Sequence, residues 1–304
     1  MLAAALVLVL AGGIFPGPAA AVEVPVPAAV AAPPASAREE SLPDAGELIR
    51  KALRSQRASE QRFDSYTFDR MEETITYRSD GTVRETTRRL FYVFSGPEPD
   101  GSSRELVEVD GRPATPDEIR KAAEDDRKAK KRRLEERAAA RVSEPKRVVG
   151  DQADPEIASR RLSDLMRRFD FRVTGQEVLA GRAAWVVEFS PRPGAPENGL
   201  GDRALNALAG RAWIDVSDLQ IRRVEAITTH PVKVAGGIVV NVKRAEVSYE
   251  AAAIAPGFWF PTRIALRLEG KKALFFPLNV GYKFELSNFR SFAVETESSI
   301  PAPN

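Results

Sequence analysis

Few residues of this sequence have the chemistry that catalysis usually requires. There is no cysteine and only one histidine among its 304 residues. The lack of cysteine excludes disulfides, thiolate nucleophiles and cysteine-based metal sites, and a single histidine excludes a multi-histidine metal centre. That histidine, His230, stands beside Pro231 at the end of a predicted strand, and no GxSxG motif accompanies it. We therefore interpret His230 as a turn residue rather than as a general base.

Carboxylates could act in pairs as general acid and base, or could bind calcium. Glu72 and Glu73 are adjacent on a predicted strand and must point to opposite faces of the sheet. Asp125 and Asp126 lie on a highly charged helix, where we expect them to be solvated. Asp215 is the remaining candidate, but the sequence places no second carboxylate beside it and contains no DxDxDG loop. We predict a protein that is not an enzyme and that holds no metal or cofactor.

Apolar and aromatic side chains recur at alternate positions of the predicted strands. One interpretation is ordinary core packing. The other is an apolar cavity for acyl chains, which needs no catalytic residue because hydrocarbon burial is non-directional. The candidate lining residues for such a cavity are Phe91, Val93, Trp185, Val187, Phe189, Trp213, Phe258, Phe260, Ile264, Leu266, Phe276 and Phe284.

The elements that must position these residues are mostly strands. Helices are predicted over 41–63, 115–142 and 155–169. Strands are predicted over 65–78, 82–95, 106–109, both arms of a hairpin that turns at 179–182, 210–217, 220–229, 237–250, 258–269, 273–285 and 286–296. One face of the sheet is apolar and the helices are too few to cover both faces. The pattern predicts an α+β fold, a curved antiparallel half-barrel of about eleven strands wrapping helices.

The N-terminus indicates export. Residues 2–15 are apolar without interruption, and Ala19-Ala20-Ala21 fits a signal-peptide cleavage site, so we predict a signal peptide over 1–21. An uncleaved anchor is the alternative, although fourteen apolar residues are short for a span of roughly 20. Residues 22–40 are an alanine- and proline-rich linker, 41–297 a single domain and 298–304 a tail. The predicted location is the periplasm, with no membrane span after cleavage.

Charge is nearly balanced over the whole chain but not along it. There are 45 basic and 43 acidic residues, a net charge of +2, which argues against nucleic-acid binding. The helical insertion 115–147 contains twelve basic and eight acidic residues. It could be a solvated helix held by i,i+4 ion pairs. Alternatively, it could contact anionic lipid headgroups or a protein partner in the cell envelope.

The order of elements resembles the outer-membrane lipoprotein-sorting carriers, the LolA/LolB-like half-barrel family. The resemblance covers about residues 43–296. It rests on the segments DGTVRETTRRLFYVF, LVEVDGRPAT, VLAGRAAWVVEFSPRP, GRAWIDVSDLQIRRVEA and GFWFPTRIAL. The insertion 115–147 departs from the small carriers. Arg88, Arg89 and Arg182 each fit the position of the family's helix-contacting arginine, so none is assigned that role.

The resemblance implies a half-barrel whose concave side holds the acyl chains of a lipid or lipoprotein. Our leading hypothesis is a non-enzymatic periplasmic carrier or sensor of acyl chains, with a lipid or an acylated lipoprotein as its partner. The alternative is an envelope interaction or sensing protein whose barrel is filled by its own side chains and which binds a protein partner through the basic helix.

Overall fold

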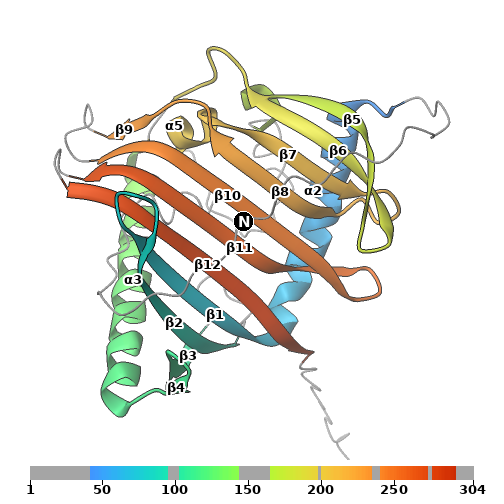
Figure 1. Ribbon diagram of the computed structural model, residues 1–304. Helices are drawn as coiled ribbons and strands as arrows, with labels where there is room; N and C mark the ends of the chain where they lie inside the picture. The colour runs from blue at the N-terminus through green and yellow to red at the C-terminus, as the bar shows by residue number, and fades with distance from the viewer. Residues whose placement is uncertain are drawn as a thin grey trace, which may run out of the picture.

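The computed structural model describes residues 42–94, 103–143, 165–197, 200–234, 240–272 and 276–291. In these ranges the chain forms one twelve-stranded antiparallel sheet and a few helices (Figure 1). The predicted signal peptide, linker and tail lie outside the described residues, as does most of the predicted helix 155–169. Among the described helices, none has the length and apolar character needed to cross a membrane.

The strands of the sheet are β1 (Tyr66–Tyr77), β2 (Val83–Phe94), β3 (Ser103–Val109), β4 (Arg112–Pro113), β5 (Phe169–Leu179), β6 (Arg182–Pro191), β7 (Leu208–Asp215), β8 (Ile221–Thr228), β9 (Val232–Val234), β10 (Val240–Ala255), β11 (Phe258–Lys272) and β12 (Phe276–Ser291). The helices are α2 (Ala45–Arg62), α3 (Pro116–Ser143) and α5 (Leu200–Asn206), with the 3-10 turn η1 (Phe63–Ser65) before β1. The strand order is β4-β3-β2-β1-β12-β11-β10-β8-β7-β6-β5, and β9 pairs with β10.

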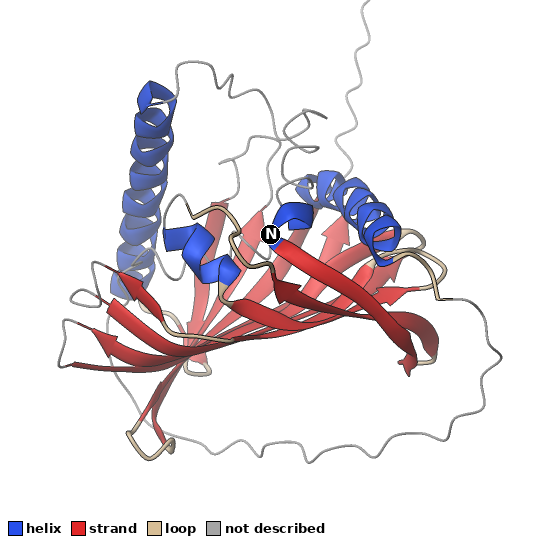
Figure 2. Cartoon of the chain, turned by 90° about the horizontal axis from the view of Figure 1, so that it is seen from above, coloured by secondary structure: helices blue, strands red, loops and turns tan. Residues whose placement is uncertain are grey.

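The two faces of this sheet have different environments. All the described helices lie on one side, which we call the covered face, and the opposite side is the open face (Figure 2). The register aligns residues of the same face, because Val247 pairs with Leu266 and Leu266 with Tyr282. Their neighbours along each strand point to the open face. Helices on one side only explain why the strands alternate between apolar and charged residues.

Helix α2 is amphipathic and begins at a side-chain cap. The carboxylate of Asp44 accepts a 2.7 Å hydrogen bond from the backbone N–H of Glu47. The apolar side of the helix, with Leu48, Ile49 and Ala52, packs on the covered face of β5, β6 and β7. Burial of these side chains fixes α2 across that end of the sheet.

Helix α5 lies on the covered face near β9, at one end of the long strands (Figure 1). Ala204 and the adjacent Ala207 and Leu208 pack among covered-face side chains of β10 and β11, including Val247 and Leu266. The helix has only seven residues, and its apolar contacts are mainly small side chains. It therefore covers only part of the long strands beneath it.

The predicted fold class is confirmed by the sheet itself, which is antiparallel, open and covered by helices on one face. Turns at Asp80-Gly81 and Asp110-Gly111 join β1 to β2 and β3 to β4, with positive φ at both glycines. The separate strands predicted over 273–285 and 286–296 are wrong, because β12 continues from Phe276 to Ser291. A bulge with Asn288 at φ 52° interrupts the alternation there without ending the strand.

Candidate functional site

Asp215 is a buried anion whose carboxylate is held by several hydrogen bonds. It is fully buried, and Arg182 donates two 2.8 Å hydrogen bonds to its carboxylate. The backbone N–H groups of Ser217 and Asp218 donate to the same carboxylate, at 3.0 and 2.9 Å. Burial raises the pKa of Asp215, but these hydrogen bonds outweigh it and hold the pKa below its usual value. Its oxygens fix the turn after β7.

Of the other residues considered for chemistry, His230 and Glu73 have partners of their own. His230 is exposed after β8, with Nδ1 3.0 Å from the hydroxyl of Thr229. Glu73 pairs with Arg88 and Lys283, while Glu72 points to the covered face, as the strand alternation predicted. In the part of the chain that the structure describes, no group of acidic, histidine or cysteine residues could hold a metal.

A partly buried charge cluster joins α3 to the sheet and corrects the prediction for Asp126. The carboxylate of Asp126 accepts a 2.7 Å hydrogen bond from Nε of Arg104 on β3. Arg104 also donates to Glu72 at 2.7 Å, and Glu72 in turn pairs with Arg70. The guanidinium of Arg104 lies 4.4 Å from the centre of the Phe91 ring. Asp126 is thus held in a cluster of four charges, and only Asp125 of the pair is exposed.

The pKa values of the two arginines of this cluster shift in opposite directions. It lowers the pKa of Arg70, and the nearby Glu72 compensates only in part. Burial also opposes the charge of Arg104, but its hydrogen bonds to Asp126 outweigh burial and raise its pKa. Arg104 is therefore the central cation of the cluster, held by carboxylates from both α3 and β1.

The predicted cavity residues are brought to one face with a few exceptions. Register and packing place ten of them on the covered face: Phe91, Val93, Trp185, Val187, Phe189, Phe258, Phe260, Ile264, Leu266 and Phe284. Trp213 lies on the open face, where it packs with Val186 and donates a 2.8 Å hydrogen bond to Glu177. Phe276 is 66% exposed at the start of β12.

These covered-face residues do not line one continuous space. Phe91 and Val93 belong to a packed cluster with Phe68 and Leu106, beside α3. Val187 belongs to the cluster under α2, and Leu266 to the cluster under α5. Much of the covered face is therefore filled by the protein's own side chains.

Between the clusters lies a strip of half-buried apolar side chains, which we call the apolar strip. It consists of Ile264, Leu278, Val280, Tyr282 and Phe284 on β11 and β12. Burial raises the pKa of the Tyr282 phenol, as expected for a hydroxyl in apolar surroundings. The strip is the part of the covered face where apolar side chains are only partly covered by the described residues.

Three members of this strip were missing from the predicted lining residues. Leu278, Val280 and Tyr282 alternate with polar residues along β12, so the signal was present in the sequence. Alternation alone could not show that α5 stops short of them, because that depends on tertiary packing.

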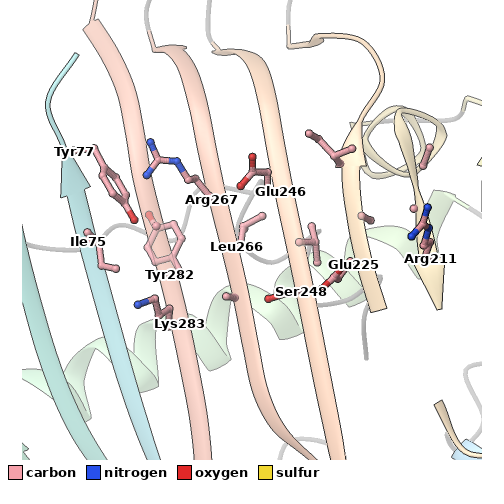
Figure 3. Close-up of a pocket in the computed structure, with 17 residues that line it drawn as sticks. Ile75, Tyr77, Arg211, Glu225, Glu246, Ser248, Leu266, Arg267, Tyr282 and Lys283 are labelled. Carbon is pink, nitrogen blue, oxygen red and sulfur yellow. The ribbon is translucent and has the colours of Figure 1, made fainter. Parts of the chain in front are cut away.

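The open face has a hollow of about 560 Å³ that crosses the strands from β1 to β7 (Figure 3). Ser248 and Ala265 are among its small lining residues, with Arg267 and Tyr77 at one end and Arg211 at the other. Several rim charges are neutralised by neighbours on the sheet. Arg267 pairs with Glu269, Arg211 with Glu188, Lys283 with Glu73 and Glu246 with Arg244.

Comparisons with known proteins find similar solved structures but no similar sequence family. No family model matches the chain, and no curated protein matches its sequence. A LolA superfamily protein from Nitrosomonas europaea is similar over 82% of this chain and 94% of its own, with 14% identity and a TM-score of 0.31. An outer membrane lipoprotein-sorting protein domain from Vibrio parahaemolyticus matches over 82% and 95%, with 10% identity and a TM-score of 0.29. A chain of the Pseudomonas aeruginosa MucA/MucB complex matches over 82% and 99%, with 10% identity and a TM-score of 0.23.

Proposed function

We propose that this protein is a non-enzymatic periplasmic binding protein that holds an acyl chain of a lipid or lipoprotein against the apolar strip. The observation that carries the proposal is the partial burial of Ile264, Leu278, Val280, Tyr282 and Phe284 beside fully packed clusters. An acyl chain laid along β12 would complete the burial of this surface. Threonines of β1 pair with the strip, since Thr74 lies opposite Tyr282 and Thr76 opposite Val280.

The energetics of this binding need no catalytic or charged group. Each buried methylene contributes about 0.8 kcal/mol. A chain of about ten buried methylenes would thus gain on the order of 8 kcal/mol before the entropic cost of association is subtracted. Such binding selects for chain length and not for headgroup, which suits either a carrier or a sensor.

The test is titration of the protein with a fluorescent long-chain fatty acid, which supplies an acyl chain without a bilayer. Ile264→Trp is expected to weaken binding at least tenfold, because the larger ring fills the strip while keeping it apolar. Ile264→Asp is expected to abolish binding by placing a carboxylate in the strip.

Ile227→Asp is the matched control, because Ile227 is 37% exposed on the open face of β8. It should bind the fatty acid as the unchanged protein does. Circular dichroism and the unfolding midpoint of each variant identify any loss that is due to misfolding. Absence of binding by the unchanged protein, or equal loss in the two aspartate variants, would contradict the proposal and favour a self-filled barrel that binds a protein partner.

A further inference from the structure

The charges of α3 are segregated along its length. Residues 116–126 contain five acidic and two basic residues, whereas 127–143 contain eight basic and two acidic residues. The densest part is the run Arg127-Lys128-Ala129-Lys130-Lys131-Arg132-Arg133. Figures 1 and 2 show α3 extending away from the sheet on the side of the other helices. The basic half of the helix is therefore a cationic arm.

The helix dipole does not account for this distribution. Cations are favoured at a helix C-terminus, but the effect falls off within the last turn. The basic run begins at Arg127, sixteen residues before the helix ends at Ser143. Only Arg141 and the residues next to it lie close enough to the terminus to gain from the dipole.

The cationic arm is anchored to the sheet by a cluster of ion pairs, whose formation costs desolvation free energy. The acidic half is anchored by Asp126, through Arg104 to Glu72 and Arg70. These four side chains are between 11% and 27% exposed, and their partial removal from water carries a desolvation penalty that a purely apolar contact would avoid. A helix that only had to be solvated would need no such anchor. The cluster directs the basic half away from the sheet.

The basic half also lacks the apolar stripe that a protein-binding or inserting helix would present. After Ala123, the large apolar residues of α3 are Leu134 and Val142. A helix of this kind binds by charge alone, and an extended anionic surface suits it better than an apolar groove.

We propose that the basic half of α3 docks the protein on an anionic phospholipid bilayer. Because α3 rises from the covered side of the sheet, docking turns that side toward the lipid (Figure 2). The inference deepens the proposed function by naming how the acyl-binding face would meet the lipid. Only the biological purpose of docking rests on the proposed function. The docking itself depends on charge and not on the apolar strip.

The test is cosedimentation of the full chain with vesicles of phosphatidylcholine, with or without 30% phosphatidylglycerol (about one anionic lipid in three). The unchanged protein should bind the anionic vesicles more tightly than the neutral ones, and the difference should shrink as salt is raised from 50 to 300 mM. The apolar residues 2–15 contain no charged side chain, so the difference between the two kinds of vesicle measures the contribution of charge.

The decisive variant is the triple substitution Lys128→Gln, Lys130→Gln and Lys131→Gln. It should weaken binding to anionic vesicles on the order of a hundredfold. The matched control changes Lys233, Lys243 and Lys271 to glutamine, which are exposed lysines elsewhere on the sheet. The control removes the same charge and should weaken binding by no more than about threefold. Circular dichroism should show the same helical content in both.

Equal binding to neutral and anionic vesicles, no vesicle binding, or equal loss in both triple variants would overturn the inference. Fatty-acid titration separates it from the proposed function. The α3 triple variant should still bind fatty acid in solution. Vesicle docking without any fatty-acid binding would contradict the proposed function and leave the docking inference standing.

Discussion

Buried charges in this protein are held by directional hydrogen bonds. Arg182 and Arg222 both approach Asp215, and both guanidinium groups lie within 5.5 Å of the Trp259 ring centre. Trp259 donates a 2.9 Å hydrogen bond to Asp218, so the ring closes the cluster. Removal of Asp215 leaves the buried Arg222 with an unmatched charge, which costs more than the loss of one contact.

We expect Asp215→Asn to lower the free energy of unfolding by about 3 kcal/mol, because Arg222 would remain buried without its anion. Urea denaturation followed by tryptophan fluorescence measures the change. The control is Glu285→Gln, which breaks the half-exposed 3.2 Å pair with Arg263 and should cost no more than about 1 kcal/mol. Equal effects in the two variants would contradict a structural role for Asp215.

For single residues, the sequence predicted the face of the sheet to which a side chain points better than it predicted the residue that the side chain contacts. The opposite orientations of Glu72 and Glu73 followed from strand alternation, and the structure confirms them. Asp126 could not be assigned, because its partner Arg104 lies 22 residues away on a strand that meets α3 only through tertiary packing. Trp213 was placed with the apolar face, although its strand neighbour Ile214 occupies that position.

The start of α3 is a capping box that depends on pH. The carboxylate of Glu118 accepts hydrogen bonds from the Thr115 backbone N–H and from Arg112, at 2.9 Å each. The Arg112 hydrogen bond first, and then that of Thr115, lower the pKa of Glu118 to about 2.

Because the folded-state pKa of Glu118 lies below the ordinary value, the cap stabilises the helix fully above about pH 4.5 and is lost as the pH falls toward 2. We expect amide exchange in the first turn of α3 to accelerate over this pH window, after correction for intrinsic exchange rates. In Glu118→Ala, exchange there should be fast throughout and should show no such step. A step of equal size in the variant would exclude Glu118 as its cause.

Two strands approach closely at Gly210 on β7. A β-carbon at this position would lie 1.9 Å from the carbonyl oxygen of Glu225 on β8 and 2.8 Å from Cα of Ala226. Both atoms belong to the backbone of a central strand, so a rotamer change cannot relieve the contact. The Gly-Arg-Ala-Trp-Ile-Asp segment thus needs its glycine for strand spacing.

Gly210→Ala should therefore destabilise the protein by about 3 kcal/mol or more, toward the upper end of overpacking effects. Thermal and urea unfolding both measure this change. Ala209→Ser, next to it on the open face, is the control and should change stability by less than about 0.5 kcal/mol. A well-folded Gly210→Ala protein of unchanged stability would show that β7 and β8 can separate.

Elements were predicted well where alternation was regular and poorly where a bulge interrupted it. The period of two along Leu278, Val280 and Tyr282 identified β12, but the bulge at Asn288 divided it into two predicted strands. The short helix α5 was not among the predicted helices, because seven residues give too little helical periodicity.

On the scale of the whole molecule, the sheet is held together by its first and last strands. β12 pairs with β1 from Tyr66 opposite Ser291 to Thr76 opposite Val280. This joins the N-terminal strands β1–β3 and α3 to the rest of the sheet across about two hundred residues of sequence. Pairing of such distant segments forms slowly, because loop closure must precede the contacts that stabilise it.

The continuity of the sheet predicts that it unfolds as one cooperative unit. All three tryptophans, Trp185, Trp213 and Trp259, lie on β6, β7 and β11, so their fluorescence reports on the side beyond β12. The chain has no cysteine, so a single Ser103→Cys on β3 can carry a dye that reports on the other side.

The two urea transitions should coincide, because loss of β1–β3 would leave an edge of β12 and part of the apolar strip uncovered. Weakening the junction with Gly281→Val, which would crowd Tyr77 and Ile75 across β1, should shift both transitions together. Separate transitions would instead show that the α3 side opens independently, with β12 as a hinge between two stable halves.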